Sequence, residues 1–302
     1  MSAVITKLSE MVIIIIIGYI SAKAKISGPE FNRYTSSVLT NVLLPATILK
    51  AMTGLGAGSN GEVVYVILLF FLMMGIAGVI GKIISIIIPL EDDERGIMLG
   101  VIMYMNISFV GFPLVESFYG AEGMFYACLS CVPMNILMFS SGVAVISGDK
   151  SKGINLKQLL NLPLVSTLVG IVLIVFGLPL PPLAASTINS LASATIPISM
   201  LILGSSLAAI PIVSAVTDWK IYVVAFARLL VCPIVTNLVL RLFVDNEMLI
   251  GAVTILASTP VAVLMTPLCV QYGKSDRLPS KSIFITTVIS VFTMPLIMGL
   301  LL

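Results

Sequence analysis

The stretch "MNISFVGFPL" at residues 105–114 interrupts a long apolar run and decides how the rest of the chain is interpreted. Asn106 brings an amide, Gly111 loosens the backbone, and Pro113 cannot donate a backbone hydrogen bond. Because lipid offers no hydrogen-bond partners, such a break is tolerated only where protein or an aqueous cavity supplies them. The stretch therefore predicts a broken helix at a functional position.

The composition around this stretch is that of an all-α polytopic membrane protein. Of 302 residues, 59% are hydrophobic and 10% are charged, whereas soluble domains carry about 25% charge. The charged residues separate apolar runs of roughly twenty residues, the length of a helix that crosses a ~30 Å hydrocarbon core. Short alternating segments, which are typical of membrane barrels, are missing from the sequence.

Several function classes are excluded or disfavoured by what the sequence lacks. It contains no histidine, so imidazole proton relays and histidine metal sites are excluded. No Walker motif, metal-ligand cluster or Ser-His-Asp set occurs, so we expect no metal, no cofactor and no enzymatic activity. A net charge of +2 gives no reason to expect a nucleic-acid partner. Cys128 and Cys131 form C-x-x-C, which we interpret as packing residues rather than a redox pair.

The apolar runs predict ten transmembrane helices. They lie at about 3–22, 34–52, 62–89, 95–118, 121–147, 158–177, 183–208, 218–243, 247–270 and 280–301. With the N-terminus outside, the cytoplasmic ends hold twelve basic residues: Lys23, Lys25, Arg33, Lys82, Arg95, Lys150, Lys152, Lys157, Lys220, Lys274, Arg277 and Lys281. The outer ends hold three, which are Lys7, Lys50 and Arg241. This asymmetry predicts that both termini lie outside the cell membrane.

The two halves of the chain are faintly similar in an inverted arrangement. Residues 40–49 ("TNVLLPATIL") match 193–202 ("SATIPISMLI"), and 118–123 ("FYGAEG") match 271–276 ("QYGKSD"). A third match, in the same order, joins 130–139 ("SCVPMNILMF") and 291–300 ("VFTMPLIMGL"). A first half of five helices crosses the membrane an odd number of times, so the second half begins on the other side and is upside down relative to the first. We therefore predict a five-plus-five inverted repeat, with repeats at about 1–147 and 158–302.

The ninth predicted helix carries a second break, "ASTPVAVLMTP" at residues 257–267, which contains Ser258, Thr259 and Pro260. Breaks at corresponding positions of two inverted halves are the best sequence indication of a transporter's central site. Half-helix N-termini at such a site would face a bound anion. The sequence therefore predicts a substrate site formed by the fourth and ninth helices.

Three other polar residues in apolar helices have open interpretations. Asn135 and Asn41 would either contact substrate or bond to a neighbouring helix. Arg228 lies about ten residues into its helix, where an arginine costs about 2.5–3.5 kcal/mol and needs a partner. It would serve as a counter-charge for an anionic substrate, or it would donate to carbonyls freed by the broken helices, which we favour.

Acidic residues near the membrane lie towards the outer helix ends, at Glu10, Glu62 and Glu116. No carboxylate stands at mid-depth, which disfavours exchange of protons or sodium by a carboxylate pair. Sodium held by carbonyl, Asn or Ser oxygens is left open as the coupling ion, as is a proton. The acidic cluster at 91–94 is interpreted as a solvated cytoplasmic loop.

The broken stretches also resemble the auxin efflux carrier family in its compact prokaryotic form. "NISFVGFPL" is similar to that family's fourth-helix signature at Asn106, Gly111, Pro113 and Leu114, and "STPVAVLMTPLCVQYG" is similar to the ninth-helix signature. The opening "GYISAKAKISGPEFNRYTSSVLTNVLLPATILKAM", residues 18–52, resembles the family's N-terminal region. The similarity runs in order along the whole chain, although Met105 stands where the family often has proline.

The resemblance implies the transporter fold of bile-acid sodium symporters. Scaffold helices at about 3–52 and 158–208 would form a homodimer contact. Transport helices at about 62–147 and 218–301 would move in an elevator-like manner, with the fourth and ninth helices crossing at the site. The family's substrates are organic anions such as indole-3-acetate.

We therefore expect a secondary carrier of a small organic anion, an auxin-like carboxylate or a dicarboxylate, in the cell membrane. The predicted substrate-binding residues are Asn106, Ser108, Gly111, Pro113, Ser258, Thr259, Pro260, Asn135 and Asn41. Sodium-coupled symport and a non-transporting membrane sensor are the alternatives. An ion channel is disfavoured because the sequence has no charged ring or filter repeat.

Overall fold

The computed structural model describes residues 2–53, 62–148, 160–208 and 216–302 of the chain. Almost all regular structure in these ranges is helical, apart from an isolated antiparallel bridge between Met105 and Val261. The all-helical class is therefore confirmed. The chain divides into two compact units, which are described separately. The first comprises Met1–Val66, Ser108–Cys131 and Leu160–Ala209, and the second comprises Ile67–Ile107, Val132–Leu159 and Ile210–Leu302.

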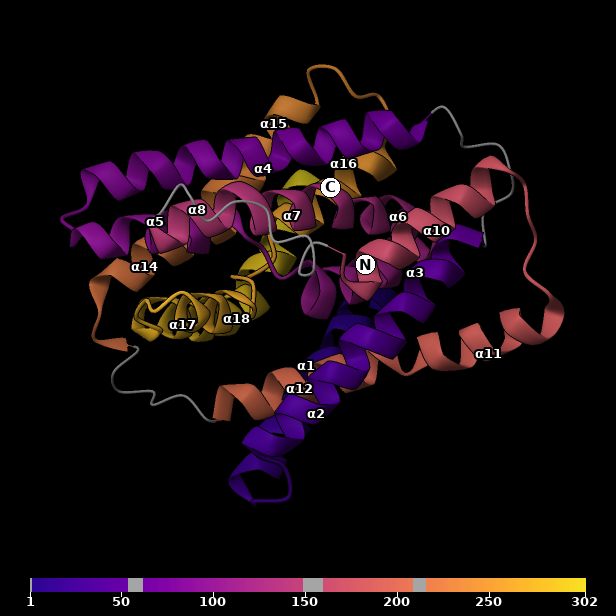
Figure 1. Ribbon diagram of the computed structural model, residues 1–302, viewed down its shortest axis with the longest axis horizontal. Coiled ribbons are helices and arrows are strands. Elements are labelled where there is room, and N and C mark those ends of the chain that lie inside the picture. The colour runs from indigo at the N-terminus through magenta and orange to yellow at the C-terminus, as the bar shows by residue number, and fades with distance from the viewer. Residues whose placement is uncertain (1, 54–61, 149–159, 209–215) are drawn as a thin grey trace. The chain divides into compact units, whose positions relative to one another are not determined.

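The first unit is held together by helix pairs that pack closely. Its elements are α1 (Ser2–Lys23), α2 (Pro29–Val38), η1 (Leu39–Leu43), α3 (Leu44–Thr53), α6 (Phe112–Leu129), α10 (Leu162–Val175), α11 (Pro182–Ser193) and α12 (Thr195–Ala208). The most extensive contact joins α1 and α12 (Figure 1). Gly18 faces the Leu201 carbonyl and Gly204 faces the Ile15 carbonyl, and a Cβ atom at either glycine would overlap that oxygen. Small residues thus let the two backbones approach.

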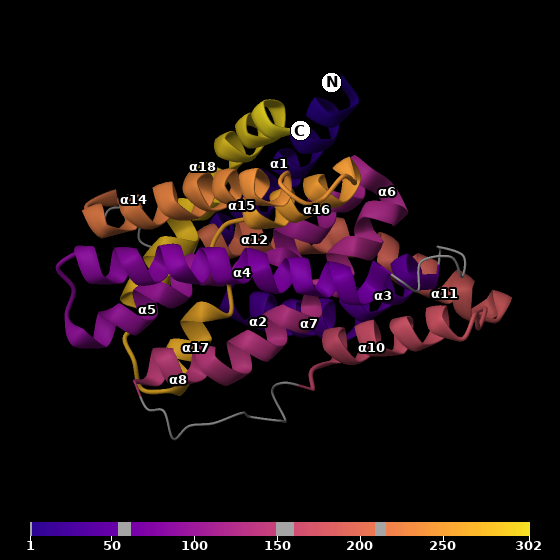
Figure 2. The same ribbon diagram turned by 90° about the horizontal axis from the view of Figure 1, so that it is seen from above.

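The second unit contains the two helices that the sequence predicts to be broken. Its elements are most of α4 (Glu62–Ile87), α5 (Asp92–Met103), α7 (Cys131–Leu137), η3 (Met138–Gly142), α8 (Val143–Ser147), α14 (Trp219–Phe226), η4 (Ala227–Val231), α15 (Cys232–Leu240), α16 (Glu247–Ala257), α17 (Met265–Gln271) and α18 (Arg277–Leu301). In Figure 2, α14 and α15 follow one another along one line, and α16 folds back beside α15. Helix α5 packs against α8.

Four π-helical segments occur in the described residues, η1, η3, η4 and η2 (Ile107–Gly111). Three of them are followed by a proline two residues beyond their last residue, at Pro45, Pro113 and Pro233. A proline ring clashes with the carbonyl four residues earlier and removes one helical bond, and the wider π turn accommodates both effects. Prolines that would kink an α-helix are thus absorbed without ending the helical path.

Helix bounds agree with the predicted ranges to within a few residues where both can be compared. Gly120, at φ 60° and ψ −148°, separates the predicted helices at 95–118 and 121–147. By length and composition, five helical segments among the described residues could cross a membrane: Glu62–Ile87, Ile107–Ser147, Pro182–Ala208, Trp219–Leu240 and Arg277–Leu301. The start of the helix predicted at 158–177 and the predicted cytoplasmic residues Lys150, Lys152 and Lys157 lie outside the described residues. The count of ten stays a prediction.

Candidate functional site

The fourth predicted helix opens at the start of the stretch 105–114. Helix α5 ends at Met103, and residues 104–106 are not helical. Tyr104 has an extended backbone with φ −92° and ψ 123°, and the π-helical segment η2 begins at Ile107. The helix therefore breaks although Met105 rather than proline stands before Asn106.

The ninth predicted helix is interrupted over a longer segment. Helix α16 ends at Ala257 and α17 begins at Met265, so residues 258–264 lie between two half-helices. Pro260 has no N–H to continue the helical ladder. The Ser258 hydroxyl donates to the Ile255 carbonyl at 2.7 Å, and the Thr259 hydroxyl donates to the Leu256 carbonyl at 2.8 Å. Both side chains thus satisfy carbonyls at the C-terminus of α16.

The two breaks supply each other's backbone hydrogen bonds within the second unit. The Asn106 N–H donates to the Pro260 carbonyl at 2.9 Å, and the Ala262 N–H donates to the Tyr104 carbonyl at 3.0 Å. Met105 and Val261 form the antiparallel bridge between these bonds. We call residues 104–106 and 258–262 the paired breaks. Their pairing explains how irregular backbone is tolerated inside an apolar fold.

Arg228 lies in η4 and is fully buried. Its Nε donates to the Thr259 carbonyl at 3.1 Å, its Nη1 to the Ile102 carbonyl at 3.4 Å and its Nη2 to the Leu256 carbonyl at 3.5 Å. Ile102 and Leu256 lie in the last turns of α5 and α16, where the helix dipoles are negative. These bonds match the interpretation that Arg228 donates to carbonyls freed by the broken helices, because one guanidinium contacts both helices.

Thr286 is a contributor that the sequence analysis missed. Its Oγ1 accepts the Val261 N–H at 3.2 Å and donates to the Ser282 carbonyl at 2.6 Å, so α18 supports the second break. The available signal was the run "SIFITTVIS" at 282–290, whose hydroxyl residues recur at helical spacing. Ser282, Thr286, Thr287 and Ser290 are all buried.

The predicted site residues divide between the two units. In the second unit, Asn106 is 3% exposed, Ser258, Thr259 and Pro260 are buried, and Asn135 is half-buried in α7. The others belong to the first unit. There Ser108 is half-buried and Gly111 and Pro113 are buried, whereas Asn41 is exposed and its Nδ2 donates to the Ser37 carbonyl at 2.9 Å. The structure therefore brings Asn106 together with the segment 258–260 through the backbone pairing.

Two of the three acidic residues singled out in the sequence have partners away from the paired breaks. Glu62 accepts a hydrogen bond from the Tyr126 hydroxyl at 3.2 Å, and Glu116 pairs with Lys50 at 3.3 Å. Within the described ranges, no group of three or more acidic or cysteine side chains could hold a metal ion. The four cysteines, including Cys128 and Cys131, are free and buried.

In the acidic cluster at 91–94, Glu91 and Asp93 are exposed, as the sequence predicts, whereas Glu94 is half-buried. Glu94 pairs with Lys220 at 2.7 Å, with both side chains less than one-third exposed. Asp93 pairs with Lys274, although Asp93 itself is 77% exposed. The cluster therefore connects the start of α5 to the start of α14 and to the segment before α18.

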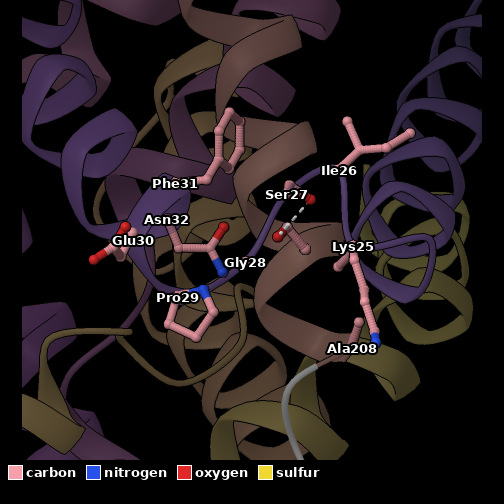
Figure 3. A pocket seen from close by; sticks show the side chains of 11 residues that line it. Lys25, Ile26, Ser27, Gly28, Pro29, Glu30, Phe31, Asn32 and Ala208 are labelled. Carbon is pink, nitrogen blue, oxygen red and sulfur yellow. Dashed lines mark hydrogen bonds between the residues drawn. The ribbon is translucent and has the colours of Figure 1, made fainter.

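A cavity of about 610 Å³ lies in the first unit, between the end of α1, the start of α2 and the end of α12. Figure 3 shows the Ser27 hydroxyl bonded across it to Ser205, with the Lys25 and Glu30 side chains on opposite sides. None of the residues that line this cavity is a predicted site residue. The cavity therefore does not extend the candidate site.

The sequence profile of a family described as membrane transport protein matches residues 3–153 and 150–298. The chain belongs to this family, the auxin efflux carriers. A transporter of Methanothermobacter thermautotrophicus is 23% identical over 288 residues, which cover 95% of this chain and 94% of that protein. A transporter of Methanocaldococcus jannaschii is 25% identical over 294 residues, which cover 95% of each. Both are described as uncharacterized transporters.

Membership of the auxin efflux carrier family settles the coarse function. The protein is a membrane transport protein and not an enzyme. The apolar helices and the family together make it a multi-pass membrane protein. The paired breaks thereby become a candidate for the site at which this transporter holds its substrate.

Proposed function

We propose that this protein is a secondary transporter of a small organic anion, and that the paired breaks form part of its substrate site. The observation that carries the proposal is the reciprocal bonding of Asn106 to Pro260 and of Ala262 to Tyr104. Irregular backbone at the meeting of two broken helices is the usual setting of a transporter's central site. A carboxylate is the favoured ligand because amides, hydroxyls and half-helix N-termini are donors to anions.

Asn106 is the principal donor in this proposal. Its side-chain amide would bond one carboxylate oxygen, with Ser108 as a second donor. Thr259 would be a third donor, and its hydroxyl would then have to exchange its present bond to the Leu256 carbonyl. Gly111, Pro113 and Pro260 would keep the backbone open, and Ser258 would cap α16. Asn135 and Asn41 complete the proposed set of substrate-binding residues.

The proposal includes an architecture finer than the family assignment. Ten transmembrane helices would form a five-plus-five inverted repeat, with both termini outside the cell membrane. Scaffold helices at about 3–52 and 158–208 would contact a second copy of the chain. Transport helices at about 62–147 and 218–301 would move against the scaffold in an elevator-type alternation. The basic residues at the predicted cytoplasmic ends support this orientation.

Two other functions are separated from this one by measurement of flux. A sodium-coupled symporter would use carbonyl and hydroxyl oxygens as ion ligands, and its uptake would depend on a sodium gradient. A non-transporting sensor would be stabilised by the anion but would show no uptake. Proteoliposomes loaded with and without a sodium gradient distinguish all three.

The test is uptake of radiolabelled indole-3-acetate and succinate by purified protein in proteoliposomes. We expect saturable uptake of at least one acid, and a loss of about tenfold or more in Asn106→Ala, since one charge-assisted hydrogen bond is worth ~1.5–3 kcal/mol. Asn189→Ala is the matched control, because Asn189 is exposed in α11. Wild-type uptake in Asn106→Ala would remove Asn106 from the site. Saturable binding without flux would favour the sensor.

A further inference from the structure

The π-helical segment η3, Met138–Gly142, has a different origin from the other three. No proline follows it at the position where Pro45, Pro113 and Pro233 follow theirs, and the next proline along the chain is Pro163. A π turn is less favourable than an α turn and needs a local cause. The sequence of the segment, "MFSSG", contains two serines and a glycine but no proline. The cause of the π turn therefore lies either in these residues or in what packs against them.

The side chain of Tyr104 reaches this segment from the first of the paired breaks. Tyr104 is fully buried, and its hydroxyl donates to the Leu137 carbonyl at 2.9 Å. Leu137 is the residue immediately before η3. A Cβ atom on Gly142 would overlap the same hydroxyl, so the phenol fills the space opened by the π turn. A side chain inserted into the helical ladder is a recognised cause of such distortion.

Two serines of η3 offer a competing explanation. The Ser140 hydroxyl donates to the Ile136 carbonyl, and the Ser141 hydroxyl donates to the Leu137 carbonyl at 3.3 Å. Serine bonds of this kind bend α-helices and need no outside partner. They do not, however, explain why a glycine stands opposite the Tyr104 hydroxyl. At the Leu137 carbonyl itself, the bond from Tyr104 is shorter than the bond from Ser141.

A small cavity lies beside the phenol. It measures about 20 Å³ and is lined by Tyr104, Ser141, Gly142 and five residues of α5 and α8. That is room for one water molecule. Tyr104 is fully buried all the same, so its ring is held by packing as well as by its hydrogen bond to the Leu137 carbonyl.

We propose that Tyr104 is a positioning residue whose hydroxyl keeps η3 in its π form. Its backbone carbonyl already accepts the Ala262 N–H, so a single residue connects the end of α5, the second break and η3. One extra residue in a turn rotates the flanking helix by about 100°. The direction in which α7 presents Asn135, relative to α8, thus depends on this phenol. The link to Asn135 as a substrate residue rests on the proposed function.

Backbone hydrogen exchange of the purified full-length protein in detergent tests the structural half of this inference. In Tyr104→Phe we expect amides of 136–142 and of the paired breaks to exchange about five- to a hundredfold faster than in the wild type. Tyr222→Phe is the matched control. Its phenol also donates to a carbonyl, that of Val216 at 3.0 Å, but it is 44% exposed. We expect no change in those peptides for the control.

Serine variants decide between the two causes of the π turn. If Ser140→Ala or Ser141→Ala loosens 136–142 and Tyr104→Phe does not, the serines hold the segment and the inference is wrong. If Tyr104→Phe loosens it and the serine variants keep wild-type exchange, the phenol is the cause. A wild-type exchange pattern in Tyr104→Phe overturns the inference whatever the transport assay shows.

Transport kinetics test the positioning half. When only a fraction of the protein has the geometry that binds substrate, the apparent affinity for substrate falls by that fraction. The complex, once formed, still turns over at its usual rate. For succinate or indole-3-acetate, we therefore expect Tyr104→Phe to raise KM about tenfold and to leave the maximal rate within about twofold. An unchanged KM in a variant with loosened η3 would reduce Tyr104 to a purely structural residue. If the wild type moves neither acid, the proposed function fails, and the exchange experiment still decides the role of the phenol.

Discussion

Replacing Arg228 by methionine separates two roles that this buried arginine could have in the proposed anion transporter. Methionine has a similar length and no charge, so Arg228→Met removes the donors to the carbonyls of Thr259, Ile102 and Leu256 and keeps most of the volume. If the guanidinium holds the broken helices together, the variant loses stability. If it serves as a counter-charge for substrate, the variant stays stable and loses affinity for the anion.

The geometry gives the expected size of the effect. The bond from Nε to the Thr259 carbonyl, at 3.1 Å, is of full strength, whereas those at 3.4 and 3.5 Å are longer than usual. Before the helices pack together in the membrane, Arg228 would face lipid at a cost of about 2.5–3.5 kcal/mol, and packing removes this cost. The methionine variant does not gain this free energy when its helices pack. It also leaves the Thr259 carbonyl without its donor. We expect a loss of about 3 kcal/mol, or about 6 to 12 °C in Tm.

The assay is thermal unfolding of the purified protein in detergent, with Arg241→Met as the control. Arg241 bonds Glu247 at 3.0 and 3.2 Å, Asn237 at 3.1 Å and the Leu301 carbonyl at 3.0 Å, so it has at least as many bonds as Arg228. Because Arg241 is 39% exposed, however, we expect Arg241→Met to cost only about 1 kcal/mol. Arg228→Lys keeps the charge but not the forked donors, so we expect an intermediate Tm. A Tm for Arg228→Met within about 2 °C of wild type would refute the reasoning.

Two further substitutions examine neighbouring features. Thr286→Val removes the acceptor of the Val261 N–H, so we expect a loss of about 1 kcal/mol, seen as a Tm lower by about 2 to 4 °C, and an unchanged Tm would show that this bond contributes nothing. Asp93→Asn breaks the pair with Lys274, but because Asp93 is 77% exposed we expect a change under about 0.5 kcal/mol in the same assay. A Tm drop above about 5 °C would mean that this pair holds the start of α5 in place.

The break at residues 258–264 could be predicted because its cause is local. Proline removes a backbone donor wherever it stands, so Pro260 marks this interrupted helix without knowledge of the fold. The membrane class could be predicted as well, because composition can be counted without knowledge of which residues are in contact. What proline does to each helix was less accessible. At Pro113 the preceding turn widens into η2, whereas at Pro260 the helix stops altogether.

The partners of the breaks could not be predicted, because they come from distant parts of the chain. Tyr104 and Thr286 look like ordinary residues of apolar helices, and their roles appear only once Leu137 and Val261 are beside them. The antiparallel bridge between residues 105 and 261 likewise has no local signal. Met105 illustrates the point, since the helix opens there through pairing with the second break rather than through a proline.

The contacts of Arg228 also indicate where charge is available to a substrate. The guanidinium lies among carbonyls at the negative ends of α5 and α16, so much of its field is already balanced by those dipoles. In the proposed site, a carboxylate would therefore depend on neutral donors. Asn106 is one of these, and its backbone N–H bonds Pro260, the residue after Thr259. It follows that substitutions at Asn106 and Arg228 should have opposite signatures, with affinity lost at the first and stability lost at the second.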